Sequence, residues 1–173
     1  MFRRHFLPLL VCGLLVCLSN SSSSADRNYK IWETAKNKIG STKWSVQNDW
    51  RGKSGYVNRW KCNLFVYDVL LKAKAEVPSR RPWGHYPIGA NAWANPRSWY
   101  VRWTGCYRRV SDNRKRKGDV IAFQRRGASG HMGIVSTYGF YISAGKHTVT
   151  ETSIKGFLRG NKIVQTTIWR YTC

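Results

Sequence analysis

The sequence predicts an α+β domain in which helices come first and an antiparallel sheet follows. Apolar residues recur at helical spacing in the first half, over residues 26–39 and 62–74. Short segments rich in Val, Ile and Thr fill the second half, at residues 119–124, 131–138, 148–152 and 163–169. Because the helical patterns precede the strand patterns and do not alternate with them, we expect the sheet to be antiparallel.

Residues 1–25 are predicted to be a secretory signal peptide that is removed from the folded protein. Two arginines precede an apolar run over residues 6–18, which is too short to cross a membrane, and small polar residues follow. Small residues allow cleavage after Ser19 or after Ala25. We therefore expect a secreted, extracellular protein with a single domain over residues 26–173 that acts as a monomer.

The first predicted helix covers residues 26–39. Ile31, Ala35 and Ile39 are spaced four apart on one face, and Gly40 is a favourable helix end. The following segment, residues 41–60, is rich in Gly and Trp and is expected to form an ordered loop.

The second predicted helix begins at Cys62 and runs to about residue 74. Its apolar positions recur three or four apart, at Cys62, Phe65, Val66, Val69, Leu70 and Ala73. Cys62 therefore opens the buried face in or near the first turn, where backbone N–H groups are unpaired and the helix dipole is positive. A thiol in that position is biased towards the nucleophilic thiolate.

Residues 78–118 contain four of the five prolines and few periodic signals, which indicates a long structured insertion with a short helix near residues 90–93. The pattern changes at Gly118. Two predicted strands, residues 119–124 and 131–138, are joined there by a hairpin loop of sequence Arg-Arg-Gly-Ala-Ser-Gly.

The charge of the chain is extreme. It carries 30 Lys and Arg against 8 Asp and Glu, a net charge of +22, which becomes +20 when the two arginines of the signal peptide are removed. Such a field attracts polyanions. For a secreted protein we expect the anionic bacterial surface and its cell wall, with nucleic acid bound only non-specifically.

Three cysteines remain after signal removal: Cys62, Cys106 and Cys173. In an oxidising compartment at most one intramolecular disulfide can form, so one thiol is left over. A Cys106–Cys173 bridge would hold a C-terminus that otherwise frays, and it leaves Cys62 free. The alternative is a disulfide from Cys62 to one of the other two, with an inert or intermolecular thiol remaining.

A thiolate nucleophile needs a base, normally a histidine, and a group that orients the imidazole. The candidates are His85, His131 and His147. His131 opens a strand after a glycine-flanked hairpin, and Gly133 on the same strand face leaves room for the Cys62 helix to approach. The histidines are dispersed, with no zinc-binding spacing, so we expect no metal and no other cofactor.

Three segments resemble the NlpC/P60 and CHAP superfamily of papain-like cysteine amidases and endopeptidases. They are Lys-Cys-Asn-Leu-Phe-Val at residues 61–66, Gly-Asp-Val-Ile-Ala-Phe at residues 118–123, and Gly-His-Met-Gly-Ile-Val at residues 130–135. Their order covers residues 29–152. The cationic, secreted form is more narrowly similar to the domesticated amidase effectors, which resemble the second family of type VI secretion amidase effectors.

The resemblance implies a papain-like fold, with Cys62 as nucleophile and His131 as general base. It implies peptidoglycan as substrate, with the crosslink between D-Ala and a diamino acid as the bond that is cut. Glu151 resembles the acidic third residue of CHAP-type members. We favour it for that role because a carboxylate can fix the tautomer of the imidazole. Ser143, where NlpC/P60 members often carry histidine, and His147 remain alternatives for that role.

Aromatic and basic residues interleave after residue 90. Aromatic faces pack on sugar rings, and cations bind carboxylate or phosphate. We expect substrate binding by Trp60, Trp99, Trp103 and Arg102, although some tryptophans of so aromatic a chain belong to the core.

Two hypotheses follow. The first is a secreted cysteine peptidase-type peptidoglycan hydrolase acting in antibacterial defence. The alternative is a non-enzymatic cationic protein that binds cell walls, membranes or nucleic acid, whose action would depend on salt but not on a thiol.

Overall fold

A computed structural model of the chain describes residues 16–80 and 86–173, with side chains from residue 24 onward. The elements in chain order are α1 (Val16–Lys36), η1 (Ser54–Tyr56), α2 (Cys62–Lys72), α3 (Ala90–Ala94), α4 (Trp99–Trp103), β1 (Tyr107–Val110), η2 (Asp112–Arg114), β2 (Val120–Arg125), β3 (His131–Thr137), β4 (Phe140–Ala144), β5 (Val149–Ser153), α5 (Ile154–Gly160) and β6 (Ile163–Tyr171). This confirms the α+β class.

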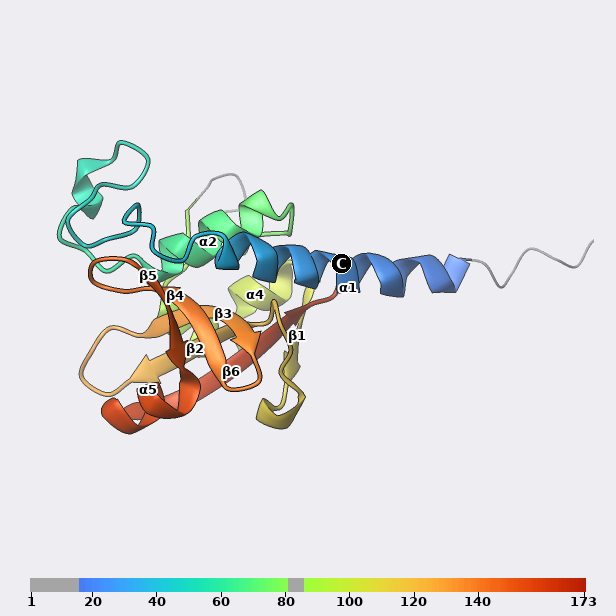
Figure 1. Cartoon of the computed structure of the whole chain (residues 1–173). Coiled ribbons are helices and arrows are strands. Elements are labelled where there is room, and N and C mark those ends of the chain that lie inside the picture. Colours follow the sequence, from blue (N-terminus) through green and yellow to red (C-terminus); the bar gives the residue numbers. More distant parts are fainter. Residues whose placement is uncertain (1–15, 81–85) are drawn as a thin grey trace, which may run out of the picture.

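The six strands form one antiparallel sheet in the order β1-β6-β2-β3-β4-β5. Figure 1 shows α1 and α2 together on one face of the sheet and α5 on the other. Because side chains alternate between the faces of a strand, each face has its own apolar cluster. The larger cluster joins Ile134 and Ile142 to the helices, and the smaller one joins Phe123 and Tyr141 to α5.

Helix α1 differs from its predicted bounds at both ends. It ends at Lys36, three residues before the expected end, and Gly40 adopts a φ of 84° in the turn that follows. It begins at Val16 and continues through both expected cleavage positions. Residues 1–15 of the expected signal peptide lie outside the described part of the chain. No helix in the described ranges is long and apolar enough to cross a membrane.

The four predicted strands are confirmed, as is the short helix near residue 90, but β1, β4, α4, α5 and the two short 3-10 helices were not predicted. Strand β1 carries two consecutive arginines, which an exposed edge strand tolerates. Strand β4 follows a two-residue turn directly after β3. Helix α5 contains glycine, and it begins because the Ser153 side chain accepts a hydrogen bond from the Gly156 N–H.

Gly118 and Asp119 organise the start of β2. Gly118 has a φ of 86°, and a Cβ there would collide with the backbone carbonyl of Asn28 on α1. The Asp119 carboxylate is fully buried and forms an ion pair with Arg170 of β6 at 2.8 Å. Burial raises the pKa of Asp119, and the hydrogen bond from Arg170 opposes that shift. This turn therefore fixes β2 between α1 and β6.

The Cys106–Cys173 disulfide is present, and Cys62 is the free cysteine of the described chain. The bridge joins the residue before β1 to the last residue, two positions after β6 ends. It adds a covalent link to a β1–β6 ladder that already pairs Tyr107 with Tyr171.

We predict that the double variant Cys106→Ser/Cys173→Ser will be less stable than the wild type by about 2 to 4 kcal/mol, because the closed loop spans a sequence separation of 67 residues. Urea unfolding of both proteins under the same buffer conditions measures the difference. A loss below about 1 kcal/mol would show that the β1–β6 ladder holds the terminus without the bridge.

Candidate active site

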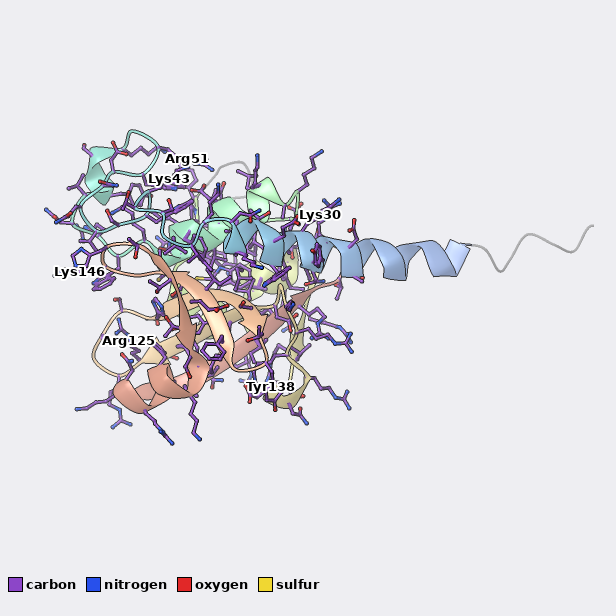
Figure 2. All side chains as sticks on the ribbon, viewed as in Figure 1. Lys30, Lys43, Arg51, Arg125, Tyr138 and Lys146 are labelled. Atoms are coloured by element: carbon purple, nitrogen blue, oxygen red, sulfur yellow. A yellow bond between two sulfur atoms is a disulfide. The ribbon has the colours of Figure 1, made fainter. Side chains whose placement is uncertain are left out.

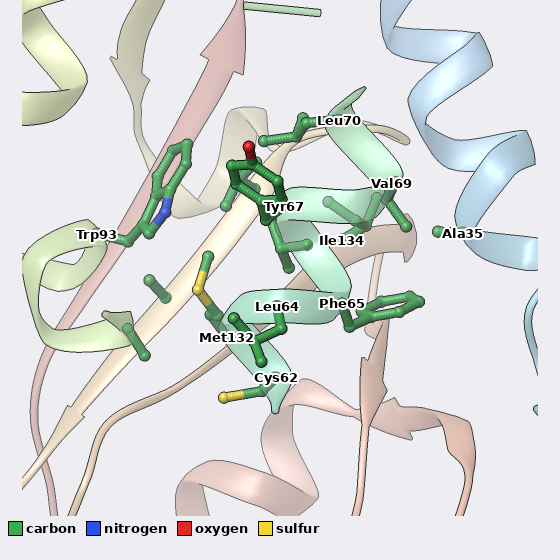
Figure 3. Packing of buried hydrophobic residues seen from close by; sticks show 14 of the residues in the cluster. Ala35, Cys62, Leu64, Phe65, Tyr67, Val69, Leu70, Trp93, Met132 and Ile134 are labelled. Carbon is green, nitrogen blue, oxygen red and sulfur yellow. The ribbon is translucent and has the colours of Figure 1, made fainter. Parts of the chain in front are cut away.

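Cys62 is the first residue of α2 and its side chain is only 4% exposed. Figure 3 shows it at the start of the helix, close to Met132 of β3. Burial raises the pKa of the Cys62 thiol. Hydrogen bonds from the backbone N–H groups of Met132 and Asn63 act in the opposite direction but do not outweigh burial. The structure therefore holds a neutral thiol here, in contrast to the thiolate that the helix position alone suggests.

Lys61, directly before Cys62, is fully buried. Its ammonium group donates hydrogen bonds to the backbone carbonyls of Ser45 at 2.8 Å, Arg59 at 3.0 Å and Val46 at 3.2 Å. These three bonds replace the lost hydration of a buried cation. Desolvation lowers the pKa of Lys61, and Asp49 partly offsets that shift. Lys61 thus holds the loop before α2 against the start of that helix.

His131 is the first residue of β3, and its Nε2 lies 3.0 Å from the Ser143 hydroxyl of β4. The imidazole also packs on Phe157 of α5, with ring centroids 4.9 Å apart. Burial, and secondarily the positive charge of Arg125, lower the pKa of His131 to about 4. The ring is therefore neutral near pH 7, and with Nε2 bonded to Ser143 its Nδ1 is the nitrogen left to exchange a proton.

Cys62 of α2 and His131 of β3 both line one pocket of about 230 Å³. Its other lining residues are Trp60, Arg125, Gly130, Tyr141, Ser143, Gly145, Thr150, Thr152 and Phe157. Among the described residues there is no hydrogen bond between the thiol and the imidazole. The thiol and the imidazole therefore share this pocket without being bonded to each other.

The register of the sheet places Ser143 beside His131 and directs Glu151 elsewhere. Strand β4 pairs Ser143 with Thr150 and Ile142 with Glu151 of β5. Since successive side chains point to opposite faces, Thr150 and Thr152 line the pocket and Glu151 does not. Glu151 is exposed. Ser143 therefore occupies the position beside the imidazole that the sequence analysis gave to Glu151.

Of the other two candidate histidines, His147 is exposed in the turn between β4 and β5 and does not line this pocket. His85 lies outside the described residues. Gly133 also has a different role from the one expected, because a Cβ there would meet the Ile142 carbonyl and the Tyr141 ring. The absence of a Cβ at Gly133 thus allows β4 to pack closely against β3, and it is not needed for the approach of the Cys62 helix.

Two further pockets continue from the first one. A pocket of about 480 Å³ shares Trp60, Cys62 and Gly130 with it. A third pocket, of about 360 Å³, shares Arg80 and Tyr100 with the second. These shared walls connect the thiol to the aromatic residues of α4.

The structure distributes the predicted substrate-binding residues unevenly along these pockets. Trp60 is 53% exposed beside Cys62, and the exposed Trp99 and Trp103 line the third pocket. Arg102 is exposed on the same helix but lines none of the three pockets. Four other tryptophans, Trp44, Trp50, Trp93 and Trp169, are buried in the core.

Sequence reasoning missed Arg125, which was expected in the hairpin loop but ends β2 and lines the Cys62 pocket. The alternation of side chains along β2 could have predicted its position. Phe123 pairs with His131, and Arg125 lies two positions beyond Phe123, on the same face of the strand.

Neither a protein-family model nor a curated protein sequence matches this chain.

Alkylation of Cys62 tests the buried thiol. A folded-state pKa above the ordinary value means that the thiolate fraction, and with it the rate with iodoacetamide, keeps rising with pH above about pH 9. We expect slow alkylation at neutral pH, slower than that of N-acetylcysteine under the same conditions. A rate that is already maximal and independent of pH near pH 6 to 7 would show a preformed thiolate–imidazolium pair.

Proposed function

We propose that this protein is a cysteine peptidase-type peptidoglycan hydrolase with a papain-like, NlpC/P60-type arrangement of its catalytic groups. The observation that carries this proposal is the shared pocket of Cys62 and His131, with Ser143 on the far nitrogen of the imidazole. A thiol at a helix start, a base on an adjacent strand and a polar group behind the base form the constellation of thiol-dependent acyl transfer.

The mechanism starts from a neutral pair. As the Cys62 sulfur attacks the peptide carbonyl, His131 takes the thiol proton through Nδ1, while Ser143 accepts a hydrogen bond from Nε2–H and holds the ring in place. Backbone N–H groups at the start of α2 stabilise the oxyanion. His131 then gives its proton to the departing amine, which leaves a thioester on Cys62. Water, deprotonated by His131, attacks the thioester and releases the carboxylic acid and the thiol.

The surroundings of the pocket fit a glycopeptide substrate with negative charge. Exposed tryptophans line the connected pockets and can pack on sugar rings. Figure 2 shows basic side chains, among them Lys30, Lys43 and Lys146, spread over the molecule and not confined to one patch. A net charge of +22, or +20 without the two arginines of the expected signal peptide, draws the protein to the anionic bacterial wall. By resemblance, the bond cut is the crosslink between D-Ala and a diamino acid, and the setting is secreted antibacterial defence.

One observation favours the second candidate, a cationic antibacterial protein without catalysis. The basic side chains extend far beyond the pocket, so binding to a polyanion does not need Cys62. Such binding would weaken with salt and be indifferent to thiol alkylation.

We predict that Cys62→Ala will fold, bind isolated sacculi and release no soluble muropeptides above the level of a blank. Mass spectrometry of the supernatant detects the products and names the bond cut by the wild type. Circular dichroism of the variant is the control for its fold, because a cationic chain binds sacculi through its charge alone. Undiminished release of muropeptides by Cys62→Ala would rule out the thiol mechanism.

We predict that Ser143→Ala will lower kcat by about 10- to 100-fold, because the imidazole loses the partner that orients it. The matched variant Glu151→Gln should stay within about 2-fold of the wild type, since Glu151 lies outside the pocket. Steady-state hydrolysis of a cross-linked muropeptide measures both. A larger loss of kcat in Glu151→Gln than in Ser143→Ala would show that Glu151, and not Ser143, orients the His131 imidazole.

A further inference from the structure

Arg125 is the one charged side chain among the residues that line the pocket of Cys62 and His131. It ends β2, two residues past Phe123, and Phe123 is the cross-strand partner of His131. Alternation along the strand therefore directs Arg125 to the same side of the sheet as the imidazole. Figure 2 shows it at the end of the sheet that carries the hairpin.

Neutral oxygens fix the guanidinium group in place. Nε donates to the Ser129 carbonyl at 2.6 Å, Nη1 to the Asn161 side-chain oxygen at 3.3 Å, and Nη2 to the Ser129 hydroxyl at 3.5 Å. A guanidinium has five N–H donors, so these three contacts leave two for a ligand. The partners hold the group without neutralising its charge.

No carboxylate of the described chain pairs with Arg125. Other partly buried ion pairs of the protein are complete, such as Arg170 with Asp119 and Arg51 with Asp68. Neither pocket that contains Cys62 has an Asp or Glu among its lining residues, and the second pocket adds another cation, Arg80. The walls around the thiol are therefore cationic, with no acidic group to balance them.

We propose that Arg125 binds a free carboxylate of the substrate peptide next to the bond that Cys62 attacks, so that the site selects peptides with that carboxylate over their amidated forms. The inference rests on the proposed hydrolase function and names the chemical group that its substrate must present. Planar guanidinium and carboxylate groups match in a bidentate pair, which fixes orientation as well as charge.

Electrostatics links this subsite to catalysis. The charge of Arg125 lowers the pKa of both Cys62 and His131, which favours the thiolate but opposes the imidazolium that attack creates. A bound carboxylate cancels much of that charge, and His131 then accepts the proton more readily. The substrate that fits the subsite therefore helps to activate the base.

Binding and hydrolysis of a cross-linked muropeptide test the proposal in separate arms. The probe set is the peptide with all carboxylates free and a series in which one carboxylate at a time is converted to the amide. Binding is measured by calorimetry in the Cys62→Ala background, with and without Arg125→Gln, and hydrolysis is measured with Cys62 present. Arg126→Gln is the matched control, because Arg126 is the exposed neighbour and loses the same charge.

We expect Arg125→Gln to weaken binding of the free peptide by about 10- to 100-fold, a range typical of lost charge-assisted hydrogen bonds. One amidated peptide should show the same loss with Arg125 intact and almost no further loss with Arg125→Gln. Arg126→Gln should change binding by less than about 2-fold. Arg125→Lys keeps the positive charge but loses the planar guanidinium that forms a bidentate pair. Its affinity should therefore lie between those of Arg125→Gln and the protein with Arg125 intact.

The inference is overturned if Arg125→Gln, or Arg125→Lys should the glutamine variant not fold, weakens binding of every peptide in the series equally. It is also overturned if no amidation changes the affinity of the protein with Arg125 intact. The proposed hydrolase function fails separately, if the wild type binds these peptides but cuts none of them.

Discussion

The contact between the first turn of α2 and strand β3 is the one on which the candidate site depends. Met132 lies close to Cys62, its backbone N–H lowers the pKa of the thiol, and Met132 follows His131 directly in the chain. This contact brings the Cys62 thiol and the His131 imidazole to one pocket, although they come from segments some seventy residues apart. Much of the remaining fold supports it: Lys61 ties down the loop before α2, and the Gly118–Asp119 turn fixes the strand that pairs with β3.

Burial determines the chemical state of the pair. Both the thiol and the imidazole are shifted towards their neutral forms, and Arg125 adds a positive charge that His131 must overcome when it accepts a proton. Helix α5 contributes to this state, because Phe157 covers one face of the imidazole. Burial also protects the Cys62 thiol from oxidation, because oxidation needs access to the thiolate.

The sequence could predict the parts of the site that depend on local patterns. The positions of Cys62 at the head of an apolar helical stripe and of His131 at the start of a strand follow from residue spacing. The odd number of cysteines favoured the Cys106–Cys173 bridge but left a disulfide from Cys62 open, and the structure decides for the bridge. The third residue does not follow in this way, because whether Ser143 or Glu151 faces His131 depends on the register of β4, a strand that was not predicted. Arg125 was missed because two consecutive arginines before Gly127 are typical of a loop, whereas β2 extends one residue further than predicted.

The measurement that tests the proposed thiol mechanism most directly is intact-protein mass spectrometry of the protein quenched in acid during incubation with a stem peptide. The account predicts a covalent adduct with the mass of the acyl fragment, located on the proteolytic fragment that contains Cys62 and absent from Cys62→Ala. Turnover by a protein that never carries such an adduct, and whose rate survives complete alkylation of Cys62, would contradict it.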